Sequence, residues 1–472
     1  LADFITTKPM SPANQLPLDS DKAAQLGYYG SKPADLMNQA IDTVQHEYTH
    51  NITKFPEFAN VMKNTMDAGV PSGLQLKGKP GDGISKFAPE NRWGTFGSVG
   101  LGWVVSEESF FKNIKSIEFL KLKASWGTIG NANGIRENAY LPGINTGGSA
   151  VFGDTVYPSV TTSYIPDPNL HWEVVRGTDL GLEFSALGQK LTGEFTVYNR
   201  TTKDIITRVS VPNDERVLLT NLGEISNKGI EVGLGYKDKI GDDFTYSINP
   251  NFSYNKNNVE SIGDNFNFQL LGNGGVNVTS SGNPIADFFG YRQVGIYQSF
   301  SQMDNLPLID GAQPGDIAYE DVNGDGVITS ADRVNLGNPV PNWNYGINVN
   351  FGYKNFDILA QGQGVAGNYV YTQRRTSRFA VINFESNRAN AWTGPGTSNV
   401  EPILDNTRPN NYLFSNHYLE PGDYFRIRTL QLGYTLSNNK TLQKIALNNL
   451  RLYISGQNLK TWSKTTGYTP EV

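Results

Sequence analysis

The residues 321–332 have the types and spacing of a calcium-binding loop. Calcium takes about six to eight oxygen ligands, and a loop of about twelve residues supplies them from fixed positions. The side chains at these positions are Asp321, Asn323, Asp325 and Asp332, the backbone carbonyl belongs to Val327, and Gly326 is at the sharp turn. The last ligand is Asp rather than the longer Glu, which predicts weaker affinity. The pattern therefore predicts a bound Ca²⁺ that orders the loop.

A second interpretation of residues 321–332 needs no metal. Asp, Asn and Gly are common in turns because their side chains bond to the local backbone, and such a turn would simply cap a hairpin. Nothing near the loop resembles a catalytic acid–base pair. Both interpretations stay open on the sequence.

A second constellation is His46-Glu47-Tyr48-Thr49-His50. On a helix the two histidines would share a face and could bind zinc, with Glu47 activating water. A catalytic zinc needs a third protein ligand, and no further histidine follows at the required spacing. The alternative is that His46 and His50 lie on a solvated polar face, opposite an apolar stripe.

Composition narrows the class of protein. Only 18% of the 472 residues are charged, whereas the chain has 50 glycines, 23 tyrosines and 24 phenylalanines. This composition favours strands and turns over helices. The net charge of −6 argues against a nucleic-acid partner, and the absence of cysteine excludes disulfides and thiolate sites.

The sequence has no apolar run of the ~18 residues that a transmembrane helix needs. The remaining way to cross a bilayer is a closed β-barrel. Because the chain starts at Leu1 without a secretory signal, we expect a mature or truncated product.

Alternating apolar and polar residues dominate from about Gly94 onward, separated by Gly, Asn, Asp and Pro. This pattern is typical of membrane-barrel strands. The expected strands are 96–104, 120–126, 178–184, 191–198, 229–236, 244–249, 344–353, 425–434 and 450–457. Their inward residues are mostly Asn, Thr, Gln and Ser, which suits a wet lumen.

Aromatic residues near the strand ends are typical of the interfacial girdles of such barrels. These residues are Trp103, Trp126, Tyr198, Tyr236, Tyr254, Tyr353, Tyr434 and Tyr453. A soluble sandwich could use aromatics in its core instead. The expected strand lengths favour the membrane, because spanning strands need ~9–11 residues.

Two stretches, 260–287 and 366–423, are too long for ordinary hairpin connections. They predict one elaborated face, with short turns such as 237–243 on the opposite, periplasmic side. Trp343, Tyr369, Tyr371, Arg374 and Arg375 could contact substrate through aromatic faces and guanidinium groups. The alternative, which we favour, is that Tyr369 and Tyr371 are girdle residues and that the two arginines are solvated.

Several motifs resemble the late barrel of the SusC/RagA-like TonB-dependent outer-membrane transporters. The similar stretches are 82–87, 91–96, 122–127, 167–173, 198–204, 227–231, 290–298, 314–317 and 337–339. They are collinear over most of the chain. Residues 36–58, which contain the His46–His50 pattern, resemble zinc metallopeptidase lipoproteins encoded beside such transporters.

The resemblance implies an all-β fold: part of a large antiparallel outer-membrane barrel of ~22 strands, with a short helical N-terminal segment. It also implies a plug in the lumen, coupling to TonB, and a SusD-like surface lipoprotein as a lid, with a dimeric complex as one option. Members of this family import glycans or peptides. The plug has no counterpart in this chain.

We therefore divide the chain at residue 80. Residues 1–80 are expected to be a divergent, partly helical segment that is an insert, a fusion or a separate component. Residues 81–472 are expected to form the C-terminal part of the barrel. Half a barrel would leave open strand edges that lipid cannot satisfy, so the chain is expected to be a fragment.

The leading hypothesis is import of oligomeric nutrients through the outer membrane of a Gram-negative bacterium, in contact with lipid and without covalent chemistry by this chain. The rival is a zinc peptidase that uses His46, Glu47 and His50. A third interpretation, a secreted β-rich adhesin, explains the alternation and the calcium loop but not the collinear motifs.

Overall fold

The computed structural model describes residues 74–162, 164–210, 216–263, 268–271, 275–372, 386–437, 447 and 449–467. The chain divides into two compact units, Leu1–Leu76 and Lys77–Val472, and the first lies almost wholly outside the described residues. The fold below is that of the second unit. No helix in its described part has the length and apolar character needed to cross a bilayer.

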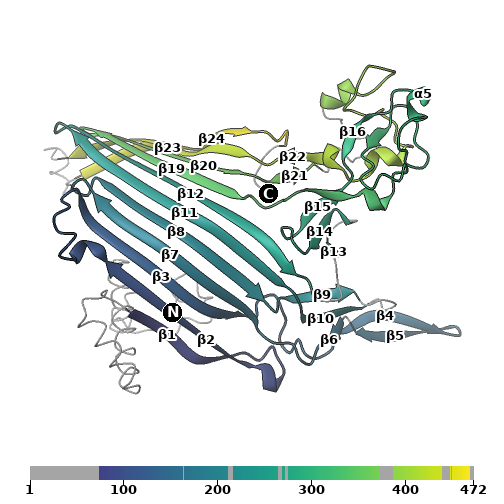
Figure 1. Ribbon diagram of the computed structural model, residues 1–472, viewed down its shortest axis with the longest axis horizontal. Coiled ribbons are helices and arrows are strands. Elements are labelled where there is room, and N and C mark those ends of the chain that lie inside the picture. The colour runs from purple at the N-terminus through teal and green to yellow at the C-terminus, as the bar shows by residue number, and fades with distance from the viewer. Residues whose placement is uncertain are drawn as a thin grey trace. The chain divides into compact units, whose positions relative to one another are not determined.

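An eleven-stranded sheet forms the main element of this unit (Figure 1). Its neighbouring strands follow the order β1-β2-β3-β7-β8-β11-β12-β19-β20-β23-β24, and the pairings from β2 to β24 are antiparallel. The strands are β1 (Leu74–Gly83), β2 (Trp93–Val104), β3 (Ile117–Asn131), β7 (Glu173–Ala186), β8 (Leu191–Lys203), β11 (Glu224–Ile240), β12 (Phe244–Ser261), β19 (Trp343–Tyr353), β20 (Phe356–Ala366), β23 (Tyr424–Ser437) and β24 (Asn449–Ser463).

Each expected strand is present in this sheet, and most are longer than predicted. The expected strand 191–198 is β8, which continues to Lys203, and the expected strand 244–249 is β12, which continues to Ser261. Two strands of the sheet were missed. One is β1, which precedes all the expected strands. The other is β20, which contains the run Gln361-Gly362-Gln363-Gly364, in which glycine replaces the apolar partner and hides the alternation. The all-β expectation is confirmed.

Cross-strand register gives the sheet two chemically different faces. Residues that pair directly share a face, since side chains alternate along each strand. Lys123, Glu183, Glu194, Ser253, Asn348 and Gln361 belong to one face, and Leu122, Leu182, Phe195, Phe252, Ile347 and Leu430 to the other. We call these the polar face and the apolar face.

The two ends of the sheet differ in the length of their connections. At one end short turns join β7 to β8, β11 to β12 and β19 to β20 (Figure 1). In the first of these, Leu187, Gly188 and Gln189 all have positive φ angles, of 59°, 70° and 62°. At the other end the connections are long: 132–172, 204–223, 262–342 and 367–423. We call these the short-turn end and the long-connection end.

The long connections contain the remaining elements. Their strands are β4 (Ile144–Phe152), β5 (Thr155–Thr162), β6 (Tyr164–Pro166), β9 (Ile206–Ser210), β10 (Val217–Asn221), β13 (Phe268–Leu271), β14 (Asn277–Ser280), β15 (Asp287–Gly290), β16 (Gln293–Ile296), β17 (Ile317–Tyr319), β18 (Val334–Gly337), β21 (Tyr369–Tyr371) and β22 (Leu419–Pro421). Their helical turns are α5 (Phe300–Met303), η5 (Ser330–Asp332), η7 (Ser386–Asn390), η8 (Pro409–Tyr412) and η9 (Asn416–Tyr418). Two more helical turns, η2 (Pro89–Asn91) and η3 (Val105–Glu107), flank β2.

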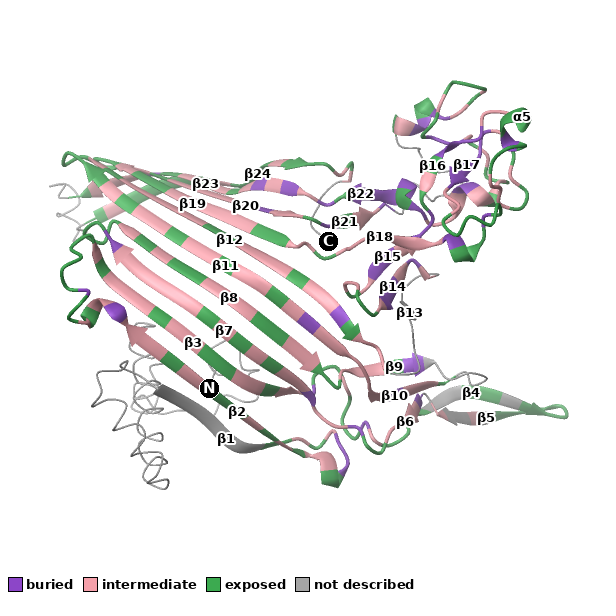
Figure 2. Ribbon diagram, viewed as in Figure 1, coloured by how far each residue is buried: buried purple, intermediate pink, exposed green. Residues whose placement is uncertain are grey.

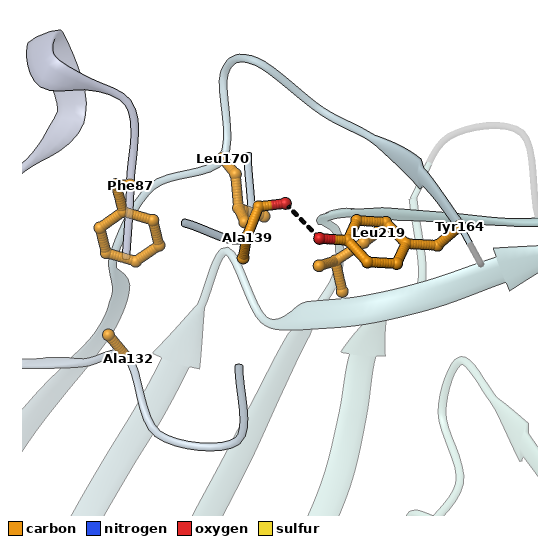
Figure 3. Packing of buried hydrophobic residues seen from close by; sticks show 6 residues of the cluster. All are labelled: Phe87, Ala132, Ala139, Tyr164, Leu170 and Leu219. Carbon is orange, nitrogen blue, oxygen red and sulfur yellow. Dashed lines mark hydrogen bonds between the residues drawn. The ribbon is translucent and has the colours of Figure 1, made fainter. Parts of the chain in front are cut away.

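A small hydrophobic core joins several connections beside β3 and β7 (Figure 3). It consists of Phe87, Ala132, Ala139, Tyr164, Leu170 and Leu219. The hydroxyl of Tyr164 donates to the carbonyl of Ala139 at 2.9 Å, so the ring is buried without losing its hydrogen bond. This core holds β6 and β10 near the end of the sheet.

A second core lies within the connections 262–342 and 367–423. Tyr291, Ile296, Ile317, Tyr319 and Ile328 form its buried centre, with Trp392 and Leu413 packed against them. We call residues 291–332 and 386–418 the two-loop body. Figure 2 shows buried residues gathered around β16 and β17, whereas the long strands of the sheet alternate between exposed and intermediate.

Candidate functional site: a two-faced wall and its loop body

The apolar face of the sheet is exposed. Leu180, Leu234 and Ile454 lie on this face and are 52%, 40% and 73% accessible. Of the described hydrophobic residues that are buried, only Ala186, Val259 and Tyr424 belong to the eleven strands. So large an exposed apolar surface indicates contact with a partner or with lipid.

Aromatic side chains border the apolar face at both ends. Near the short-turn end the rings of Tyr236 and Tyr246 lie 5.9 Å apart, and those of Phe356 and Tyr434 lie 4.7 Å apart. Near the long-connection end Tyr254 contacts Trp343 at 4.6 Å, and Tyr345, Phe425 and Trp462 stack in sequence. Tyr246 and Tyr254 are about 27 Å apart along β12, at ~3.4 Å per residue. Two aromatic bands that border an apolar face at its two ends are typical of the interfacial girdles of outer-membrane barrels.

The polar face changes character across the sheet. From β12 to β24 it carries mainly neutral amides and hydroxyls: Ser247, Asn249, Asn251, Asn348, Asn350, Gln361, Thr429, Gln431, Ser455 and Gln457. Some of these side chains bond to one another, as Asn350 does to Ser247 at 3.1 Å. This half agrees with the expected Asn, Thr, Gln and Ser lining.

The other half of the polar face is charged, which the sequence reasoning did not foresee. Lys123 bonds to Glu183 and lies 3.4 Å from Glu194, and Arg200 lies 3.0 Å from Asp179. These residues come from β3, β7 and β8, and cross-strand pairing brings them together. Oppositely charged neighbours stabilise such a ladder by roughly 0.2–1 kcal/mol each.

Two of the predicted girdle tyrosines lie on the polar face instead. Register places Tyr198 opposite Asp179 and Tyr453 opposite Gly433, both within the polar set. Each ring lies under a guanidinium, Arg200 at 4.7 Å and Arg451 at 5.3 Å. Nearness to a strand end cannot show which way a side chain points, and pairing decides it.

A shallow depression of about 400 Å³ lies along the sheet at Gly233 and Gly235. Its lining includes Glu194, Asn251 and Asn348. A Cβ at Gly233 would meet no atom within 4 Å, so the missing side chain leaves open space. The depression therefore has carboxylates on one side and amides on the other.

Side chain to backbone bonds join the two connections of the two-loop body. Asn411 accepts from the Ile317 nitrogen at 2.8 Å, and Asn416 accepts from the Gln293 nitrogen at 2.7 Å. The carboxylate of Asp316 is buried and accepts from Asn411 at 2.9 Å and from Arg408 at 3.2 Å. Residues about a hundred positions apart thus fold as one body.

The predicted calcium loop is ordered by hydrogen bonds to its carboxylates. Asp321 accepts from the nitrogens of Gly324 and Gly326, at 2.7 and 2.8 Å. Asp325 accepts from the Val327 nitrogen at 2.9 Å, and the Asn323 side chain accepts from the Asp325 nitrogen at 3.0 Å. The Asx-type hydrogen bonds of the metal-free interpretation are therefore all present.

The last predicted ligand, Asp332, is fully buried. Its carboxylate accepts from the nitrogens of Val322 at 3.0 Å and Thr329 at 2.7 Å. These backbone bonds, first that of Thr329, lower the pKa of Asp332. Among the described residues no three His, Cys, Asp or Glu side chains converge as a metal-binding group. A cation here would depend on Asn323, on the Val327 carbonyl and on the remaining carboxylate lone pairs.

Two buried ionisable features escaped the sequence reasoning. Asp287 is buried, its Oδ1 has no hydrogen-bond partner, and burial raises its pKa to about 7. His417 is buried in the two-loop body beside Glu401 and Arg388. A single Asp or His within a loop carries no sequence signal of burial, because only tertiary packing removes it from water.

Several predicted residues lie outside the described part of the chain: His46, Glu47, His50, Arg374 and Arg375. Of the other suggested substrate contacts, Trp343 belongs to the girdle, and Tyr371 packs edge-on against Phe414 at 4.9 Å. Tyr369 lies against Gly337, where a Cβ would come within 2.5 Å of its ring. The structure does not bring these three aromatics together as one binding surface.

Comparison with known proteins identifies the family. The family model described as "TonB dependent receptor-like, beta-barrel" matches residues 73–459. The chain belongs to this family. The sheet is thus part of a TonB-dependent receptor barrel, and its apolar face is the lipid-facing side. Because receptors of this family are outer-membrane proteins, this receptor chain is located in the outer membrane of a Gram-negative bacterium.

The relatives support the SusC/RagA-like resemblance. TonB-dependent receptor P3 of Formosa agariphila is 30% identical over 403 residues, which cover 83% of this chain and 39% of that receptor. TonB-dependent receptor SusC of Bacteroides thetaiotaomicron is 29% identical over 406 residues, covering 83% and 39%. The receptor chain therefore spans less than half the length of these relatives.

A solved structure described as the RagAB peptide transporter has the same fold. Its TM-score is 0.72 at 22% sequence identity, and the match covers 84% of this receptor chain and 43% of that chain. The predicted fold class and family are confirmed by these matches. The proposed division at residue 80 stays a prediction, as do the calcium and zinc ligands.

Proposed function

We propose that this receptor chain forms part of the wall of a TonB-dependent importer of oligomeric nutrients, either glycans or peptides. The two-faced sheet carries the proposal: an apolar face bordered by two aromatic girdles, and behind it a continuous polar face. Such a wall lets a hydrated oligomer pass through a hydrocarbon layer. Support for the transport mechanism comes from relatives named as TonB-dependent receptors, and support for a peptide cargo comes from the solved structure described as a peptide transporter.

The proposal assigns no covalent chemistry to the described residues. Energy would come from TonB through a plug supplied outside this chain, and a SusD-like surface lipoprotein would cover the long-connection end, with a dimeric complex as one option. The named RagAB assembly supports a two-component importer. Co-purification of one lipoprotein with the intact receptor is the expected result, and isolation of the receptor alone under mild detergent would contradict it.

Growth on defined oligomers tests the import function. A strain that lacks the intact receptor is grown on a panel of oligosaccharides and oligopeptides as sole carbon source. The strain is expected to lose growth on one oligomer class. The wild-type gene should restore that growth, and a proton uncoupler should abolish it again. Unchanged growth on every member of the panel would overturn the proposal.

The matched variants Gly233→Phe and Gly97→Phe test which face of the wall matters. A Cβ meets no atom within 4 Å at either glycine, so each position has open space where a side chain begins. Gly233 lies on the polar face in the depression, whereas Gly97 precedes polar-face Ser98 and lies on the apolar face. Import is expected to fall severalfold only in Gly233→Phe, with equal amounts of both receptors in the membrane. Equal import by the two variants would show that the imported oligomer does not pass along the depression.

We also propose that Ca²⁺ binds the loop of Asp321, Asn323, Asp325, Val327 and Asp332. Its oxygen-rich side chains already surround one turn, and carboxylates accept a cation in addition to backbone hydrogen bonds. Calcium titration by calorimetry is expected to show one site that Asp325→Ala removes. The control is Asp405→Ala, because Asp405 also caps a turn, accepting from the Thr407 nitrogen at 2.9 Å. Equal calcium binding in all three proteins would leave the loop as a metal-free turn.

The zinc peptidase alternative depends on His46, Glu47 and His50. Metal analysis of the purified chain separates it from the import proposal. Stoichiometric zinc that is lost in His46→Ala would favour the peptidase. A wild-type protein that contains no zinc would contradict the peptidase hypothesis.

A further inference from the structure

One strand of the sheet carries opposite charges on either side of two glycines. The polar-face residues in the second half of β11, in order toward the short-turn end, are Glu231, Gly233, Gly235, Lys237 and Lys239. The register assigns them to this face, because Glu231 pairs with Ser253 and Lys237 pairs with Ser247. A carboxylate and two ammonium groups therefore share one face of the strand, and the two positions between them have no side chain.

The two glycines form the floor of the depression of about 400 Å³. A Cβ at Gly233 would meet open space, whereas a Cβ at Gly235 would come within 2.6 Å of the Thr192 hydroxyl oxygen and 3.0 Å of the Asn249 amide oxygen. Polar atoms of β8 and β12, the neighbours of β11 in the sheet (Figure 1), can thus lie over the floor. Asn249 and Asn348 also line the depression, and amide side chains both donate and accept hydrogen bonds.

The end of the depression nearer the long connections is acidic. Glu194 lies directly across from Gly233, and its side chain is 60% exposed. It shares the ammonium of Lys123 with Glu183. Glu231 is exposed, and it takes part in none of the ion pairs within the described part of the chain. This end therefore offers carboxylate charge to a bound cation.

The end nearer the short turns is basic. Lys237 and Lys239 are exposed, and neither belongs to an ion pair among the described residues. Lys190 at the same end differs, because its ammonium lies 2.8 Å from the carboxylate of Asp238. Two ammonium charges on the polar face thus remain for a bound anion.

The spacing of the two charged ends sets the length of a matching ligand. At ~3.4 Å per strand residue, Lys237 lies ~14 Å along the sheet from the row of Glu194 and ~20 Å from Glu231. An extended peptide spans about 3.3–3.6 Å per residue, so its terminal amine and carboxylate have this separation when it contains about four to six residues. A neutral glycan has no charged ends, and an acidic glycan has no cation.

We infer that this charged trough binds short peptides with free termini, with the amine at Glu194 and Glu231 and the carboxylate at Lys237 and Lys239. The inference rests on the import function proposed above and deepens it, because it names zwitterionic peptides as the cargo class. The peptide backbone would pair with the amides in the middle of the trough. Solvated ion pairs are individually weak, so a bound peptide can also leave, as transport requires.

Uptake by cells tests the inference. Strains with and without the intact receptor receive a random pentapeptide library with free termini, the same library acetylated and amidated at its termini, and a mixture of oligosaccharides. Mass spectrometry measures how fast each is depleted from the medium. We expect receptor-dependent depletion to be severalfold faster for free than for blocked peptides.

The failure of this inference differs from the failure of the import function. Equal depletion of the free and blocked libraries, or receptor-dependent depletion of oligosaccharides alone, would overturn the inference and leave the import function standing. If no oligomer showed receptor-dependent depletion, the import function would fail and the inference with it.

Variants at the two ends separate cargo binding from a structural role. The double variant Glu194→Gln, Glu231→Gln should lose the preference for a free amine, measured with a library blocked only at the amine, and keep that for a free carboxylate. The double variant Lys237→Gln, Lys239→Gln should do the reverse. Lys190→Gln is the control, because this lysine is already ion-paired, and it should keep both preferences. An equal fall in uptake of free and blocked peptides in both double variants, at matched receptor amounts, would show that the trough contacts another part of the receptor instead of cargo.

Discussion

The eleven-stranded sheet and the two-loop body solve the problem of burial in opposite ways. The sheet is a single layer whose apolar side chains remain exposed, as Leu180 and Ile454 do. The two-loop body is built like a small soluble domain, with Ile317 and Tyr319 buried and the carboxylate of Asp316 fully paired. The apolar side chains of the sheet are therefore covered by the bilayer, whereas those of the two-loop body are covered by other side chains of the same chain.

The two regions are therefore stabilised by different interactions. The sheet depends on cross-strand hydrogen bonds and on lipid that covers its apolar face. The two-loop body depends on close packing, in which each lost methylene leaves a cavity. Substitutions should therefore follow different rules in the two regions.

Ile317→Ala should have the largest effect and confine it to the two-loop body. Ile317 is fully buried, so its truncation should cost about 2–5 kcal/mol. Hydrogen exchange should show lost protection in residues 291–332 and 386–418, with the strands unchanged. Val294→Ala is the control, since Val294 is an exposed neighbour on β16. Lost protection in the sheet as well would show that the two regions unfold together.

Leu234→Arg should break the sheet and spare the two-loop body. Leu234 pairs with Gly193 on the apolar face, and an arginine at the middle of the lipid layer costs about 2–4 kcal/mol. Urea unfolding in lipid vesicles measures the loss. Thr196→Arg provides the control on the polar face, where Thr196 pairs with Glu231. Equal losses in the two variants would contradict the assignment of the faces.

Asp287→Asn should stabilise the protein, but only at high pH. The folded pKa of Asp287 is raised to about 7 by burial, so the folded state favours the protonated carboxyl and loses stability as the pH rises toward and through 7. Asparagine never ionises, so the variant should gain about 1–3 kcal/mol at pH 8 and little at pH 4. Thermal unfolding at both pH values tests this.

The control for the Asp287 prediction has the opposite sign. The pKa of Asp405 is lowered, first by the hydrogen bond from the Thr407 side chain, so Asp405→Asn should lower stability at pH 8. A gain in both variants would point to a general effect of removing negative charge.

Lys464→Ala should have the smallest effect. Lys464 lies 2.7 Å from Asp423 at the long-connection end of β24, but its side chain is largely exposed. An exposed ion pair contributes about 0–1 kcal/mol and is screened by salt. Thermal unfolding at low and high salt should differ only slightly from wild type. A loss comparable to that of Ile317→Ala would mean that the strand end is buried by a partner.

The sequence predicted the strands well because a two-faced sheet has a local pattern. Side chains alternate between lipid and water, so residues two positions apart report the same environment. β8, β12 and β19 were recognised on this basis. β20 was missed because Gly362 and Gly364 occupy apolar-face positions without apolar side chains, and aromatic rings from neighbouring strands cover them.

The candidate site was less predictable. The acidic loop was found because Asp321, Asn323 and Asp325 are close in the sequence. The charged half of the polar face was missed, because Lys123 and Glu194 lie on strands far apart along the chain. Likewise, Tyr198 and Tyr453 were assigned to the girdles, and only the cross-strand register placed them on the polar face.

The all-β class, the family, most strands and the presence of long connections could be predicted from the sequence. Those properties depend on short-range periodicity and on collinear motifs. Only the tertiary structure decided that Gln293 meets His417 and that Asp316 meets Arg408. Such contacts join residues about a hundred positions apart, and their stability comes from burial, which no local pattern encodes.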